Sequence, residues 1–339
     1  MSKNDNPSKM TYEASGVSIE RGNQAVDWIK PLAQSTRRPE VVADVGGFAG
    51  AFRLGGEDLL AGADGVGSKL LLAKELGRFD TIGIDLVAMN VNDVLAAGGE
   101  PLFFLDYVAL GYLDPARVRD LVAGVAAGCR EAGAALLGGE TAEMPDLYPE
   151  GDFDLSGFAV GVRRFRPMQP PQAGDVVLGL ASSGFHANGF QLARRVVKMS
   201  GHRLDDRPSV LGGRTLGEVL LTPTRIYVAA IKDLWSQVGV KAMAHITGGG
   251  LPDNLPRTLN GLGALLEASQ WPKPPEMDLI QSWGEIEDSE MAHAFNLGIG
   301  FTVTLSPSEV ERCQSILSRH QIDSYPIGVV RQQPGVEIR

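Results

Sequence analysis

Three acidic side chains stand beside glycines or inside an apolar helical pattern, where carboxylates can hold a divalent cation. Asp64 precedes the segment Gly65-Val66-Gly67-Ser68-Lys69, and Glu140 follows a pair of glycines. Asp93 interrupts a run of apolar residues, and a carboxylate on such a face must be paired or bound to a cation. Mg²⁺ takes one or two carboxylates together with phosphate oxygens and water. The pattern therefore predicts that Asp64, Asp93 and Glu140 converge on one or more Mg²⁺ ions.

The segment after Asp64 has the composition of an anion-binding loop. Glycine lets the backbone approach a ligand, and amide groups at the start of a helix favour a phosphate. The order Ser68-Lys69 is the reverse of that in a Walker A loop, so the segment is not one. A glycine turn with a capping Asp64 explains the same residues without a ligand, and the segment alone leaves both interpretations open.

Two further segments combine glycine with polar side chains. Thr247-Gly248-Gly249-Gly250 follows a predicted strand, and three consecutive glycines suggest backbone laid against an anion. The turn Ser182–Gly189 carries His186 and Asn188. A histidine in a turn is more often structural than catalytic. The chain has no GxSxG motif, which argues against a serine hydrolase.

Composition and missing motifs exclude other classes. The net charge of -10 and the lack of a Lys/Arg run argue against a nucleic-acid binder. The sequence has no GxGxxG, no HExxH and no CxxC, which argues against dehydrogenases and zinc enzymes. The polar start Met1–Met10 is not a signal peptide, and no apolar run reaches the length of a membrane span. We expect a cytoplasmic protein with no membrane partner.

The elements that must position these residues alternate irregularly. Strands are predicted over 58–63, 101–110, 134–137, 154–162, 176–181, 240–246, 263–267 and 300–305, with a last short strand at Val329. Helices are predicted over 68–76, 85–97, 115–132, 189–199, 222–237 and 307–321. This order favours an α+β fold with mixed sheets over a doubly wound one. The proline-rich segment 163–175 predicts two domains, 1–165 and 166–339.

Taken together, these segments resemble the phosphoribosylformylglycinamidine cyclo-ligases (AIR synthetases) from about Tyr12 to Val330. The most specific stretches are Arg38–Val41, Asp64–Lys69, Thr81–Met89, Glu100–Tyr107, Gly138–Pro145, Thr222–Val228, His245–Gly250 and Phe295–Gly300. The resemblance implies two α+β domains and a homodimer, in which the N-terminal domains pair into a barrel-like β structure. It implies that formylglycinamidine ribonucleotide and ATP give aminoimidazole ribonucleotide, ADP and phosphate, with ATP phosphorylating the formyl oxygen.

The resemblance also implies roles for individual residues. It makes Asp64, Asp93 and Glu140 ligands of Mg²⁺ and neighbours of the ATP phosphates, with Asp64 also catalytic. The implied nucleotide-binding residues are Gly46, Gly47, Gly65, Gly67, Ser68, Lys69 and Thr141. His186, a candidate acid or base, and Asn188 would flank the reacting groups. Thr247, Gly248, Gly249 and Gly250 would line the phosphate of the substrate.

This chain departs from the family pattern at several positions. Glu13 stands where the family usually has lysine, Ser68 replaces threonine, and Phe185 and Ala187 change the turn around His186. Two alternatives stay open. One is a sister ATP-dependent kinase or synthetase, such as thiamine-monophosphate kinase or selenophosphate synthetase, although residues 1–60 lack the cysteine that the latter would need. The other is an inactive nucleotide-binding homologue.

Overall fold

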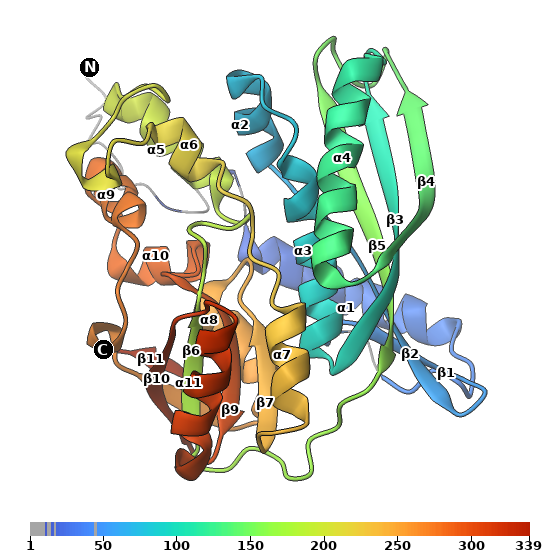
Figure 1. Ribbon diagram of the computed structural model, residues 1–339, viewed down its shortest axis with the longest axis vertical. Helices are drawn as coiled ribbons and strands as arrows, with labels where there is room; N and C mark the ends of the chain where they lie inside the picture. Colours follow the sequence, from blue (N-terminus) through green and yellow to red (C-terminus); the bar gives the residue numbers. More distant parts are fainter. Residues whose placement is uncertain (1–10, 12–14, 17, 44–45) are drawn as a thin grey trace, which may run out of the picture.

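The computed structural model describes residue 11, residues 15–16, 18–43 and 46–339 (Figure 1). The predictions for Met1–Met10 and for Glu13 lie outside the described residues. Within the described part of the chain, no helix combines the length and the apolar character needed to cross a membrane.

The first half forms an open five-stranded sheet in the order β1-β2-β5-β3-β4 (Figure 1). Its strands are β1 (Gly50–Leu54), β2 (Glu57–Gly65), β3 (Gly99–Leu110), β4 (Ala135–Glu143) and β5 (Phe153–Arg163). Only β3 and β4 pair in parallel; the other neighbours are antiparallel. The helices are α1 (Ile19–Ser35), α2 (Lys69–Leu76), α3 (Ile82–Ala96) and α4 (Pro115–Ala132).

Helices α3 and α4 cover one face of this sheet and touch each other closely. A Cβ on Gly83 would lie 2.2 Å from the backbone nitrogen of Val125, so glycine is needed where the two backbones meet. Helix α3 also contacts β7 and α7 of the second half. Because α3 is buried on nearly all sides, its polar residues Asp85, Asn90 and Asn92 must find partners inside the protein.

The second half forms a six-stranded sheet in the order β11-β8-β10-β6-β9-β7. Its strands are β6 (Val176–Ala181), β7 (Val240–His245), β8 (Gly263–Leu266), β9 (Ile299–Leu305), β10 (Ser324–Arg331) and β11 (Gly335–Ile338). Strands β8 and β11 are parallel and the others antiparallel. Both sheets are therefore mixed, and the predicted α+β class is confirmed.

Some helices of the second half lie beside its sheet, and others lie above it at the top of the view in Figure 1. They are α5 (Phe190–Ser200), α6 (Leu216–Leu220), α7 (Val228–Trp235), α8 (Gly250–Asn254), α9 (Pro275–Gly284), α10 (Asp288–Ala294) and α11 (Val310–Arg319). Short 3-10 turns occupy 209–211, 255–258, 268–270 and 307–309. Segment 164–175 joins the two sheets along the bottom of the view in Figure 1. The division into domains 1–165 and 166–339 stays a prediction.

Several predicted boundaries are wrong. The helix expected from Thr222 begins only at Val228, because Thr222 and Thr224 hydrogen-bond to Lys69 and Asp85 in an irregular segment. Strand β4 continues beyond 137 to Glu143, along the whole end of β3. The segment 307–321 starts as a 3-10 turn, and its helix ends at Arg319.

Helix α1 lies where the sequence patterns predict no element. Nearly all of its described side chains are exposed or half-buried, including Trp28 and Leu32, so it has no apolar face packed on the core. Its start is fixed by the Ser18 side chain, which accepts a hydrogen bond from the Arg21 backbone amide. Local capping, and not a core-facing stripe, marks the beginning of this helix.

Candidate active site

A pocket of about 440 Å³ opens where the loop after β2 faces the turn before α5. Its lining includes five residues that the sequence analysis selected: Asp64, Gly65, Gly67, Ser68 and Asn188. It also includes side chains that the analysis missed, namely Met89, Asp154, Ser156 and Gln191. Strand alternation was the available signal for two of them, since Asp154 and Ser156 share one face of β5.

Asp64 is the next-to-last residue of β2 and lies on the face of the sheet that α3 covers. It stands opposite Gly157, where a Cβ would lie 2.8 Å from Nδ2 of Asn90. The Asn90 amide donates to the Asp64 carbonyl at 3.3 Å, and the Asp64 Oδ1 accepts from the Gly65 amide at 2.7 Å. Burial, and then the negative charge of Asp93, raise the pKa of Asp64 to about 6. Two carboxylates that repel each other in this way form a favourable place for a dication.

Asp93, on α3, acts on Asp64 through its charge and is held from the other half of the protein. Nδ1 of His245, on β7, lies 2.8 Å from the Asp93 Oδ1. The His245 side chain is fully buried, whereas that of Asp93 is 22% exposed. The other ring nitrogen of His245, Nε2, is buried with no hydrogen-bond partner among the described residues.

Glu140 does not join these two acids within one chain. Across the sheet, Asp64 on β2 pairs with Gly157 on β5, which pairs with Asp106 on β3. Asp106 in turn pairs with Gly139 on the edge strand β4, next to Glu140. Three strand spacings separate Asp64 from Gly139, which is roughly 14 Å. Glu140 and Thr141 are exposed on β4. The prediction that the three acids converge is therefore wrong for a single chain, and the described residues contain no group of three His, Cys, Asp or Glu suited to a metal.

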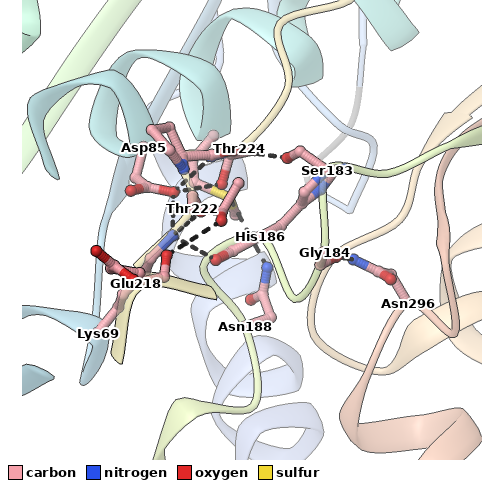
Figure 2. A network of polar contacts seen from close by, with 12 residues as sticks. Lys69, Asp85, Ser183, Gly184, His186, Asn188, Glu218, Thr222, Thr224 and Asn296 are labelled. Carbon is pink, nitrogen blue, oxygen red and sulfur yellow. Dashed lines mark hydrogen bonds and ion pairs between the residues drawn. The ribbon is translucent and has the colours of Figure 1, made fainter. Parts of the chain in front are cut away.

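Lys69 faces away from the pocket. Its side chain is fully buried and its ammonium donates to Asp85, to the His186 carbonyl and to the Thr222 carbonyl (Figure 2). An ammonium has three protons, and all three are used. The predicted contact between Lys69 and a nucleotide is thus corrected, because α2 begins at this residue and turns its side chain into the interior.

His186 is buried beside the pocket and is absent from its lining. Its Nε2 accepts from the Ser183 backbone amide at 3.2 Å, while Nδ1 is buried without a partner among the described residues. Burial lowers its pKa well below 6.5, and the charges of His245 and Lys69 act in the same direction. The resemblance made His186 a candidate acid or base, and a lowered pKa disfavours the acid role; the base role stays a prediction.

The remaining glycines have separate explanations. A Cβ on Gly248 would lie 3.6 Å from the Asn188 Oδ1, so this segment borders the pocket. A Cβ on Gly250 would lie 1.8 Å from the Ala292 carbonyl, which means that packing against α10 requires this glycine. Gly46 and Gly47 line a different pocket of about 620 Å³ on the first sheet, together with Phe48 and Leu59.

The sequence of this chain matches those of known proteins over nearly its whole length. The N-terminal domain of AIR synthase related proteins matches residues 46–163, and the C-terminal domain matches residues 172–339. A phosphoribosylformylglycinamidine cyclo-ligase of Nitrosospira multiformis is 48% identical over 99% of this chain and 97% of its own length. One of Thermosynechococcus vestitus is 50% identical, covering 95% of this chain and 96% of its own.

A solved structure with lower identity has the same fold. AaThiL complexed with AMPPCP and TMP superposes with a TM-score of 0.65 and 18% identity, over 95% of each chain. Identity of this order shows the fold alone. The matches to the named cyclo-ligases are of a different order, since nearly half of the residues are identical over almost the full length of both proteins. The chain therefore belongs to the phosphoribosylformylglycinamidine cyclo-ligase family of enzymes.

Proposed function

We propose that this chain uses ATP to close the imidazole ring of aminoimidazole ribonucleotide from formylglycinamidine ribonucleotide, releasing ADP and phosphate. The names of its relatives support this activity. The structural observation that carries it is Asp64, which lines the pocket together with the glycine loop and feels the negative charge of Asp93 behind it. That arrangement is suited to a metal-bound polyphosphate, and phosphoryl transfer depends mainly on positioning and charge neutralisation.

The residues present fit a magnesium ion. Asp64 and Asp93 are close enough for one charge to raise the pKa of the other, and both carry oxygen ligands of the kind that Mg²⁺ prefers. We assign them as its ligands. When bound, the ion would neutralise charge on the phosphates. Glu140 keeps a proposed role only at an interface with a second copy, because it lies on the exposed edge strand.

The chain itself would supply binding and orientation. The backbone amides around Gly65 and Gly67 would bind phosphate oxygens, with the Ser68 hydroxyl beside them. The Asn188 amide, at the opposite side of the pocket, would orient the formyl or amidine group of the substrate. ATP phosphorylates the formyl oxygen, which turns it into a leaving group, and a nitrogen of the same molecule then attacks that carbon. Holding both groups in one bound substrate lowers the entropic barrier.

We also propose a homodimer built on the outer face of the first sheet. Leu105 and Tyr107 of β3 and Phe158 of β5 are exposed there, with Leu137 of β4 beside them. The partners Leu105 and Phe158 stand opposite each other, so the apolar surface is continuous across two strands. An exposed apolar patch of this kind typically marks a protein interface.

Product analysis tests the proposed reaction. Purified protein is incubated with Mg²⁺, ATP and formylglycinamidine ribonucleotide, and the nucleotides are identified by mass spectrometry. We expect a product that has lost one water relative to the substrate, with ADP formed in equal amount. Phosphorylation of thiamine monophosphate in a parallel incubation, with no ring closure, would instead assign the chain to the sister kinase activity.

A further inference from the structure

A buried lysine connects the two halves of the molecule. The Lys69 ammonium lies 2.8 Å from the Asp85 Oδ1, 2.8 Å from the His186 carbonyl and 2.7 Å from the Thr222 carbonyl (Figure 2). Lys69 and Asp85 belong to α2 and α3 of the first half, and the two carbonyls belong to the second. The side chains of Lys69 and Asp85 are both 0% exposed.

Asp85 extends the connection to the segment after Thr222. Its Oδ1 accepts from the Thr224 backbone amide at 2.8 Å and from the Thr224 hydroxyl at 2.6 Å. The Ser183 hydroxyl donates to the Pro223 carbonyl at 2.6 Å, which ties the turn before α5 to the same segment. Burial raises the pKa of Asp85 and lowers that of Lys69, and the charge of each partner opposes those shifts.

The residue whose carbonyl Lys69 holds has an unfavourable backbone conformation. His186 has a φ of 61°, in the left-handed region that side chains with a Cβ seldom occupy. Such residues persist where their surroundings fix them from several sides. Lys69 binds the His186 carbonyl, and the Ser183 amide binds its ring. The next two residues, Ala187 and Asn188, line the pocket.

Lys69 directly follows a residue that lines the pocket. Its neighbour Ser68 lines the pocket, while the Lys69 side chain points to the opposite side of the loop. One short stretch of backbone therefore lines the pocket and anchors the facing turn. An ammonium that bound phosphate would have to give up three buried hydrogen bonds, and this disfavours a direct role in nucleotide binding.

We propose that Lys69 and Asp85 are positioning residues whose buried ion pair holds the His186 turn in its left-handed conformation, so that Asn188 faces the Gly65–Ser68 loop. The catalytic consequence rests on the proposed function. The structural consequence does not, because the conformation of the turn can be measured without turnover. The pair acts through the backbone of the turn and touches no substrate.

The experiment compares Lys69→Met, Asp85→Leu and the double variant with a control, Lys74→Met. Lys74 lies on the same helix and pairs with Asp152 at the surface. Each single variant leaves one buried charge without its partner, whereas the double variant removes both, and replacement of both partners is often tolerated. We expect the double variant to regain part of the melting temperature that the singles lose, since it removes both charges but leaves the partners of Lys69 and Asp85 unpaired, while kcat stays about 100-fold low because the turn is displaced.

Two further readouts separate positioning from other roles. Amide hydrogen exchange over residues 183–188 should be about tenfold faster or more in the double variant, because the turn loses its anchor. Its affinity for Mg²⁺-ATP should change by less than about threefold, whereas loss of a phosphate ligand would cost about tenfold or more. The control should match wild type in exchange, affinity and kcat.

A milder variant covers the case in which the ion-pair variants do not fold. Thr224→Val removes one donor to Asp85 and leaves both charges in place. It should accelerate exchange over 183–188 and lower kcat severalfold with little change in the KM for ATP. Unchanged exchange over this turn in every folded variant would overturn the proposal, as would a double variant that recovers kcat together with its melting temperature. If wild type makes no product, the proposed function fails while the exchange readout still tests the ion pair.

Discussion

Oδ1 of Asp93 and Nδ1 of His245 lie 2.8 Å apart, although the two residues are 152 positions apart in the chain. The contact joins α3 of the first half to β7 of the second and fixes the carboxylate whose charge raises the pKa of Asp64. The Asp93 side of the candidate metal site therefore depends on the packing of the two halves. His245 acts on the site through Asp93, since its side chain is fully buried.

Replacement of His245 should weaken metal use. In His245→Ala, Asp93 loses the partner that orients it, and losses of this kind typically lower metal affinity about 10–100-fold. Turnover should then require a correspondingly higher Mg²⁺ concentration, measured by titrating Mg²⁺ at saturating ATP. His202→Ala provides a matched control, because His202 pairs with Asp206 at the surface at 3.1 Å. An unchanged Mg²⁺ requirement in His245→Ala would contradict the role given to Asp93.

Asp64→Asn should stabilise the metal-free protein while it removes activity. The folded-state pKa of about 6 exceeds the ordinary value of 3.8, so the folded state binds the proton more tightly than the unfolded state. The contribution of Asp64 to stability therefore falls as pH rises from about 4 to about 6 and stays low above that range. At pH 8 the variant should unfold with a free energy about 1–3 kcal/mol higher than wild type.

Urea denaturation without Mg²⁺ at pH 4.5 and pH 8 measures this difference. The gain should be largest at pH 8 and mostly lost at pH 4.5. Excess Mg²⁺ should stabilise wild type and leave the variant unchanged. A variant no more stable than wild type at pH 8 would show that the Asp64 carboxylate is not destabilised in the folded state.

Substitution of Tyr107 should disrupt the proposed dimer. A charge introduced by Tyr107→Glu would lie on β3 within the exposed apolar patch of the first sheet, where burial of an unpaired carboxylate is costly. We expect sedimentation velocity to report dimer for wild type and monomer for the variant at micromolar concentration. Met168→Glu serves as the control, because Met168 is 98% exposed in the segment that joins the two sheets. A wild-type monomer would rule out the interface.

Replacement of Asn188 should affect the substrate more than ATP. Asn188→Ala removes the polar side chain that we place against the formyl or amidine group, while the glycine loop on the other side of the pocket is retained. We expect kcat/KM for formylglycinamidine ribonucleotide to fall about 10–100-fold, the range for one lost hydrogen bond to a reacting group. Equal losses for the substrate and for ATP binding would argue against the assignment.

Local signals in the sequence are sufficient to predict an element whose ends are marked by capping residues. Helix α4 was predicted with correct ends because Asp114 caps it, Pro115 occupies its first turn and Gly133 ends it in the left-handed conformation. Asp64 and Ser68 both line the pocket, and a carboxylate with glycines at a strand end suggests a ligand loop there; that this loop binds a metal or phosphate stays a prediction. These features involve only a few consecutive residues.

Features that depend on strand order and on contacts between the halves were not predictable in this way. Glu140 stands beside two glycines near the end of a predicted strand, much as Asp64 does, yet two strands separate β4 from β2. Thr224 stays outside a helix because it binds Asp85, which is 139 residues away in the chain. The spacing of apolar residues does not indicate contacts of this kind. Lys69 is therefore predicted from sequence to bind a nucleotide, whereas its hydrogen-bond partners lie in the interior of the protein.

The most direct test of the account is ADP release by the folded protein with Mg²⁺-ATP, measured with and without formylglycinamidine ribonucleotide, for wild type and for Asp93→Asn. We predict ADP release that depends on the substrate and matches aminoimidazole ribonucleotide formation in wild type, and that is lost in Asp93→Asn without loss of folding stability. ADP release at the same rate with and without formylglycinamidine ribonucleotide would contradict the account. So would full turnover by Asp93→Asn at limiting Mg²⁺.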